Sequence, residues 1–193
     1  MLRAFVTALI LLASPLATAA SLVVTVRNAR GAPVRDAVVY AIPEGREVPP
    51  SNQSAIMDQK NRMFIPHVLP IQTGTAVKFP NSDDIRHQVY SFSSAKTFQL
   101  PLYTGTPANA IVFDKRGVVA LGCNIHDRMT AYIVVVPTPH FAATNHSGRL
   151  TLSSLSAGKY ALHLWHADQR GESASVPVTL TSTEQKQIEL VAR

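Results

Sequence analysis

The feature that most limits the fold of this chain is a succession of short apolar segments rich in β-branched residues. Such segments lie at residues 22–27, 38–42, 76–79, 88–92 and 131–136. Turn-forming Gly, Pro and Asn residues occur between them, whereas no stretch of a dozen residues has helical periodicity. The sequence therefore predicts an all-β protein, built from antiparallel sandwich units with Greek-key connections.

Composition narrows the class of protein. Apolar residues make up 46% of the 193 residues and charged residues 16%, a balance typical of a globular chain rather than a disordered one. The single cysteine excludes a disulfide scaffold and a four-cysteine zinc site. The length allows one domain or two small ones.

The first twenty residues have the pattern of a secretory signal. Arg3 precedes an apolar run at residues 4–16, and small residues follow up to Ala19 and Ala20, near which we expect cleavage. The run is shorter than the roughly 18 residues that span a bilayer, so we expect an exported protein without an integral membrane segment. Loss of Arg3 reduces Lys+Arg from 18 to 17 against 12 acidic residues, which lowers the formal charge from +6 to +5. The basic residues are scattered, so we do not expect nucleic-acid binding.

Two segments rich in proline and polar residues, 43–56 and 137–145, predict linkers. They separate a central domain, placed at residues 54–137, from two flanks at residues 21–45 and 146–193. Each flank is too small to fold well alone, and joined they make a sandwich of about 70 residues.

The flanks resemble one known module. Residues 24–39 resemble the opening of a carboxypeptidase regulatory-like, or transthyretin-like, β-sandwich, and residues 148–162 are similar to its closing strands. The resemblance implies a split sandwich in which Gly158 supplies a turn and Tyr160 a buried ring. It implies no catalytic activity.

The central domain carries the residues with metal chemistry. Cys123, His126 and Met129 lie on one short segment between two strand-like runs. A lone thiol in an exported protein is open to oxidation unless something protects it, and a bound metal would do so; the alternative is an inert buried cysteine. Because zinc seldom takes a thioether and copper accepts one, this donor set fits copper best.

A trigonal copper site needs a second imidazole. His87, which lies 36 positions before Cys123 at the entry to a predicted strand, is the natural candidate. In a Greek-key sandwich an early strand end and a later loop can meet at one end of the barrel. Two histidines and one thiolate in a plane, with a long axial methionine, form the blue-copper set.

Residues from about 64 to 136 resemble the cupredoxin family, and the Cys-x-x-His-x-x-Met spacing is similar to the amicyanin-type loop. The whole is similar to the periplasmic proteins labelled methylamine utilisation proteins. The resemblance implies a periplasmic protein with one Cu(I)/Cu(II) ion held by four residues: His87, Cys123, His126 and Met129. The chain has Gln88 where many cupredoxins have Asn, and Ile125 where Pro is common. Asn81 and Asn124 are the candidates to support the ligands by hydrogen bonds.

A fixed trigonal site changes little between the two copper oxidation states, which favours single-electron transfer to an unidentified redox partner protein rather than enzyme catalysis. Three alternatives stay open: copper storage or delivery, a copper enzyme or sensor with His67 in place of Met129, and a non-metal interaction module. A cysteine nucleophile is not favoured, because no oxyanion-hole motif accompanies Cys123. We expect His67 to be an ordinary structural histidine, and Asp83 and Asp84 to be solvated turn residues.

Overall fold

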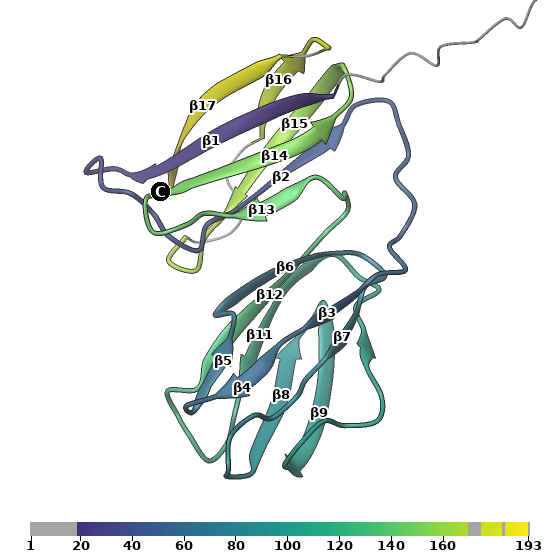
Figure 1. Cartoon of the computed structure of the whole chain (residues 1–193), viewed down its shortest axis with the longest axis vertical. Coiled ribbons are helices and arrows are strands. Elements are labelled where there is room, and N and C mark those ends of the chain that lie inside the picture. The colour runs from purple at the N-terminus through teal and green to yellow at the C-terminus, as the bar shows by residue number, and fades with distance from the viewer. Residues whose placement is uncertain (1–18, 170–174, 183, 193) are drawn as a thin grey trace, which may run out of the picture.

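The computed structural model describes residues 19–169, 175–182 and 184–192. Every regular element in these ranges is a β-strand, which confirms the all-β prediction. Figure 1 shows two β-units, one above the other. The predicted signal segment, residues 1–20, lies outside the described residues apart from Ala19 and Ala20. The described ranges hold no helix that is long and apolar enough to cross a membrane.

The upper unit, called the flanking unit here, takes its strands from both ends of the chain (Figure 1). One sheet has the order β14-β1-β17 and the other β13-β2-β15-β16. The first contains β1 (Ala20–Asn28), β14 (Arg149–Leu155) and β17 (Gln185–Ala192). The second contains β2 (Val38–Pro43), β13 (Phe141–Ala143), β15 (Gly158–Trp165) and β16 (Val176–Leu180). The residues expected to form a second linker, 137–145, therefore include β13, which pairs with β2.

Alternation along the strands builds the core of the flanking unit. Every second residue of β1 is buried from Ala20 to Val26, and the residues between are less buried. Tyr160, Leu162 and Leu164 of β15 enter the same core cluster from the facing sheet. Period-two burial of this kind is typical of two sheets packed face to face.

The lower unit, called the central unit, contains a five-stranded sheet with the order β6-β12-β11-β8-β9. Its strands are β6 (Val68–Gln72), β8 (His87–Ser93), β9 (Lys96–Tyr103), β11 (Gly117–Gly122) and β12 (Thr130–Val136). A smaller sheet has the order β10-β7-β3 and contains β3 (Ser54–Ile56), β7 (Ala76–Lys78) and β10 (Ile111–Val112). A hairpin of β4 (Asp58–Lys60) and β5 (Met63–Ile65) completes the unit.

Strand direction brings distant residues to one end of the central unit. β11 runs antiparallel to both β8 and β12, and Gly122 pairs with Tyr90 on one side and Thr130 on the other. The start of β8, the end of β11 and the start of β12 therefore lie at the same end of the sheet. His87, which opens β8, is thereby placed near the loop that begins at Cys123.

The five strands that the segments at 22–27, 38–42, 76–79, 88–92 and 131–136 predict are all present, as β1, β2, β7, β8 and β12. The pairing is less uniformly antiparallel than predicted. β1 with β17, β6 with β12, and β3 with β7 are parallel pairs. Such pairs join strands that are far apart in sequence, which local patterns do not report.

The two units meet through a third apolar cluster. On β12, Ala131, Ile133 and Val135 face the core of the central unit, while Val134 and Val136 face the third cluster. From the flanking unit, β2 and β15 contribute residues that include Trp165. The continuous apolar run at 131–136 thus reflects a strand that is buried on both faces.

Candidate metal centre

His87 is the most enclosed of the candidate ligands. Its side chain is 0% exposed, and its Nε2 lies 2.7 Å from Oδ2 of Asp83. Its Nδ1 is buried and, within the described part of the chain, has no hydrogen-bond partner. A buried polar nitrogen without a partner costs about 1–3 kcal/mol, so this atom is suited to a ligand.

The strand pairing at His87 is irregular. His87 pairs with Tyr103 and Val89 pairs with Leu100, so the extra residue lies on β9 and not on β8. His87 and Val89 therefore lie on one face of β8 and Gln88 on the other. All three are buried, which means that β8 is covered on both faces where it begins.

The loop between β11 and β12 supplies the other donors. Cys123 is a free, buried thiol directly after β11. The N–H of His126 donates to the carbonyl of Cys123 at 3.3 Å, and the N–H of Met129 donates to the carbonyl of His126 at 2.8 Å. These two short-range bonds fold the loop tightly, so that the side chains of Cys123 and His126 turn towards His87.

The structure brings three of the predicted ligands together. One donor atom each from His87, Cys123 and His126 lies within 4.8 Å of the others. Donors that share one ion in a trigonal plane at usual bond lengths are about 3.5–4 Å apart, so the group needs a movement of about 1 Å at most to share an ion. The imidazole centroids are 5.0 Å apart, and Nδ1 of His126 is also buried without a partner in the described residues. The donor set therefore fits a metal ion.

Met129 and His67 occupy different surroundings. Met129 is buried and belongs to the same apolar cluster as Cys123. His67 has a side chain that is 49% exposed, and its Nδ1 lies 3.6 Å from Oδ2 of Asp36 in the flanking unit. The three-residue group found among the described residues does not include His67. This placement agrees with a structural role for His67.

Asp83 corrects an expectation, because it is not a solvated turn residue. Its side chain is 11% exposed, and it accepts hydrogen bonds from the N–H groups of Asn61 at 2.6 Å and Arg62 at 2.9 Å as well as facing His87. Burial works to raise its pKa. The hydrogen bonds from Arg62, His87 and Asn61 outweigh that effect, so that the pKa of Asp83 is lowered from 3.8. The partners Asn61 and Arg62 lie too far along the chain for the sequence to indicate this contact.

Asn81 holds the segment that carries Asp83 and His87. Its Nδ2 donates to the carbonyls of Ile85 at 2.9 Å and Tyr103 at 2.8 Å, and its Oδ1 accepts from the N–H of Asp83 at 3.1 Å. Asn81 thus supports His87 through the backbone rather than by touching the imidazole. Asn124, the other candidate for support, is exposed.

A buried polar network lies beside His87. Tyr103, its partner across the strands, donates its hydroxyl to the carbonyl of Phe79 at 2.7 Å and accepts a hydrogen bond from the buried side chain of Gln59. Burial, with repulsion from Asp58 and Cys123, raises the pKa of Tyr103 from 10.0 to about 12, although the bond from Gln59 opposes the shift. The hydroxyl is therefore neutral at physiological pH.

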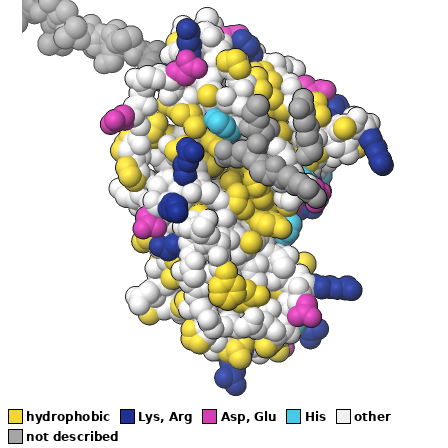
Figure 2. Space-filling model, turned by 180° about the vertical axis from the view of Figure 1, so that it is seen from behind, with side chains coloured by type: hydrophobic (Ala, Val, Ile, Leu, Met, Phe, Trp, Pro, Cys, Tyr) yellow, Lys and Arg dark blue, Asp and Glu magenta, His cyan; other side chains and the backbone are white. Residues whose placement is uncertain are grey.

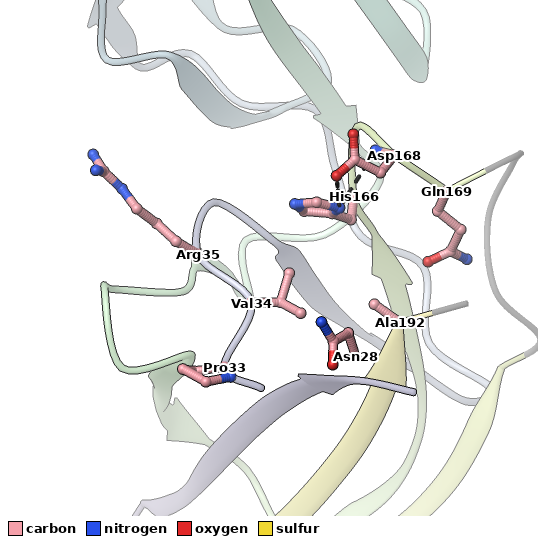
Figure 3. Close-up of a pocket in the computed structure, with 8 residues that line it drawn as sticks. All are labelled: Asn28, Pro33, Val34, Arg35, His166, Asp168, Gln169 and Ala192. Carbon is pink, nitrogen blue, oxygen red and sulfur yellow. Dashed lines mark hydrogen bonds and ion pairs between the residues drawn. The ribbon is translucent and has the colours of Figure 1, made fainter. Parts of the chain in front are cut away.

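A separate pocket of about 340 Å³ lies in the flanking unit. Figure 3 shows its lining: His166 and Asp168 lie together on one side, while the side chain of Arg35 extends away from them. None of the predicted metal ligands lines this pocket. It is therefore distinct from the metal centre.

The charges on one face of the molecule are dispersed. Figure 2 shows basic and acidic side chains scattered over the face towards the viewer, with no large area of one sign.

An exposed apolar residue lies at the candidate metal centre. Ile125, next to His126, is 50% exposed. An apolar side chain thus reaches solvent at the edge of the donor group.

Comparison with known proteins gave matches among solved structures only. No family model matches the chain, and no curated protein matches it. A Cu-containing nitrite reductase from Thermus scotoductus is 25% identical with a TM-score of 0.41; the match covers 49% of this chain and 25% of the reductase chain. A purple cupredoxin from Nitrosopumilus maritimus is 23% identical with a TM-score of 0.37, over 44% of this chain and 100% of that one. A reduced Cu(I) form of an amicyanin variant is 16% identical with a TM-score of 0.40, and the match covers 50% of this chain and 99% of the amicyanin chain.

Proposed function

We propose that this protein is a type 1 copper protein that transfers single electrons, with His87, Cys123 and His126 as equatorial ligands and Met129 as the axial ligand. One observation supports the proposal above others: two histidines, each with a buried Nδ1 that has no hydrogen-bond partner among the described residues, lie together with the only thiol of the chain. Each atom that is costly to bury alone becomes favourable as a metal ligand.

The donor types favour copper over zinc. Structural zinc sites are closed by four cysteine or histidine ligands, whereas this group has three such residues and a buried thioether three positions after His126. Two imidazoles, one thiolate and a weak axial sulfur are the donor set of blue-copper sites. Copper bound there would accept and release one electron.

The protein contributes a rigid frame for the donors. His87 is fixed by strand pairing with Tyr103, and Cys123 follows a β11 that is hydrogen-bonded on both sides. Ligands held in place by a sheet move little when the charge of the site changes, which favours electron transfer over catalysis. The proposed function is therefore that of a carrier rather than an enzyme.

Partner and location complete the proposal. We infer a redox partner protein, with the exposed Ile125 as the part of the loop it contacts. We also infer export to the periplasm with cleavage near Ala19 or Ala20. The resemblance of residues 64–136 to cupredoxins, and of the flanks to a transthyretin-like sandwich, agrees with this proposal.

Copper titration tests the proposed function. Purified protein without the signal segment should bind one copper ion, and its Cu(II) form should have the strong visible band of a copper–thiolate bond and a matching spin-resonance spectrum. Cys123→Ser should abolish the band. Absence of copper binding, or equal binding by the Cys123→Ser variant, would contradict the proposal. Binding without the strong band would instead favour copper storage or delivery.

The axial ligand is tested separately. Met129→Leu conserves volume in a buried apolar site, so the fold should be kept at a cost below about 1.5 kcal/mol. The colour should remain, while the reduction potential should rise because a donor to Cu(II) is lost. An unchanged potential would exclude Met129 as a ligand and favour the open-site alternative.

A further inference from the structure

Asp83 is the one carboxylate placed directly behind a proposed ligand in the described residues. It lies four positions before His87, and its Oδ2 is 2.7 Å from Nε2 of the imidazole, on the side of the ring opposite Nδ1. A carboxylate can only accept hydrogen bonds, so at this distance Nε2 must carry the proton. A neutral imidazole with its proton on Nε2 has a free lone pair on Nδ1.

That lone pair is where the proposed site needs it. His87 belongs to the group with Cys123 and His126, and Nδ1 is its nitrogen that is buried without a partner in the described part of the chain, since Nε2 faces Asp83. Without a fixed acceptor behind Nε2, the proton could move to Nδ1 and block the donor atom. The carboxylate therefore settles which nitrogen faces the site.

Asp83 is itself held by a different element. The N–H groups of Asn61 and Arg62, in the turn of the β4–β5 hairpin, donate to its two oxygens at 2.6 and 2.9 Å. Both turn residues have positive φ, 55° and 58°, which points their N–H groups in the same direction. The hairpin turn thus acts as a clamp on the carboxylate, and through it on the orientation of the imidazole.

We propose that Asp83 is a positioning residue of the metal centre: clamped by the Asn61–Arg62 turn, its carboxylate holds the proton on Nε2 of His87 and strengthens Nδ1 as a donor. The inference rests on the proposed function for its effect on copper. Its effect on the imidazole tautomer does not depend on copper. A carboxylate behind a metal-bound histidine increases the basicity of the ligand, and loss of such a partner typically costs 10–100-fold in metal affinity.

The first test uses the metal-free protein. Nitrogen NMR of the histidine rings should find the proton of His87 on Nε2 in the wild type. In Asp83→Ala the two tautomers should be mixed, and Asp83→Glu should restore part of the preference. A wild-type proton on Nδ1, or an unchanged tautomer in Asp83→Ala, would overturn the proposal. This result stands even if the protein binds no copper, which would refute the proposed function alone.

The second test uses the copper-loaded protein. Asp83→Asn keeps an oxygen near Nε2 but removes the charge, so Cu(II) should lose about tenfold in affinity relative to Cu(I). For a one-electron couple this corresponds to a rise of about 59 mV in the potential. The matched control is Asp84→Asn, which removes an adjacent but exposed charge and should change the potential much less because solvent screens it. Equal shifts in the two variants would show a general charge effect and overturn the positioning role.

A variant that folds poorly does not remove the test. Should Asp83→Ala and Asp83→Asn both unfold, the wild-type tautomer and its comparison with Asp84→Asn still decide the first claim. Rescue of the potential by Asp83→Glu distinguishes a specific carboxylate from a merely structural side chain.

Discussion

Single atoms decide what the candidate metal centre can do. The imidazoles of His87 and His126 each have one buried nitrogen that has no partner in the described ranges, and both of these atoms are Nδ1. In a packed interior such atoms are rare, because burial of a polar atom is unfavourable unless it is bonded. Such atoms are also found at Gln59, His163 and Gln169, but only His87 and His126 belong to the group that includes the thiol.

Tyr103 provides a pH-dependent test at the residue scale. Because its pKa is raised from 10.0 to about 12 in the folded protein, the unfolded chain loses this proton first as pH rises. The contribution of the neutral phenol is therefore fully present below pH 10.0 and is lost between there and about 12. Tyr103→Phe removes this contribution together with the hydrogen bonds to Gln59 and Phe79.

The measurement is the free energy of unfolding of both proteins, without metal, by denaturant titration at several pH values. The wild type should be the more stable below pH 10.0, by about 1–2 kcal/mol for the lost hydrogen bonds. The difference should shrink as the pH approaches about 12. A difference that stays constant over this range would contradict the assignment of a buried, neutral hydroxyl.

At the scale of elements, the segment between β7 and β8 depends on one amide. Asn81→Ala removes the bonds to the carbonyls of Ile85 and Tyr103 and the bond from the N–H of Asp83. We expect the free energy of unfolding to fall by about 2–3 kcal/mol, because backbone groups lose buried partners. Denaturant unfolding measures this change. Ser82→Ala is the control on the same segment, since its exposed hydroxyl bonds only to Asp58 and should cost under about 1 kcal/mol. Equal losses would mean that Asn81 does not anchor the segment.

The elements also separate what the sequence predicts from what it does not. The Cys123–Met129 loop can be predicted from the sequence because its donors are a few residues apart. Strands such as β1 can be predicted because apolar and polar residues alternate along them. β9 was not predicted, because Lys96, Gln99 and Pro101 interrupt its pattern; it lies at the edge of its sheet, where Pro is tolerated. The irregular pairing of β8 with β9 and the hydrogen bonds that hold Asp83 could not be predicted, since each depends on residues that only the folded chain brings together.

On the scale of the whole molecule, the two units share an apolar contact. Val134 of the central unit and Trp165 of the flanking unit belong to one buried cluster, and the ring of Tyr132 lies 5.3 Å from that of Trp165. Because β2 and β12 are each buried on both faces, separation of the two units would expose apolar surface on both. The flanking unit therefore stabilises the unit that carries the candidate metal centre.

This coupling is measurable because Trp165 is the only tryptophan of the chain and reports on the flanking side of the contact. Val134 is 3% exposed, and Val134→Ala should lower the free energy of unfolding by about 1–2 kcal/mol through lost burial and the cavity left behind. We expect the shared contact to make the two units unfold together, so Trp165 fluorescence should change at the same lower denaturant concentration although residue 134 lies in the other unit. Val112→Ala is the matched control: this valine is 46% exposed, and the same change should cost less than about 0.5 kcal/mol. If Val134→Ala shifts the circular dichroism of the sheets but leaves the Trp165 transition where it was, the units unfold independently and the contact does not couple them.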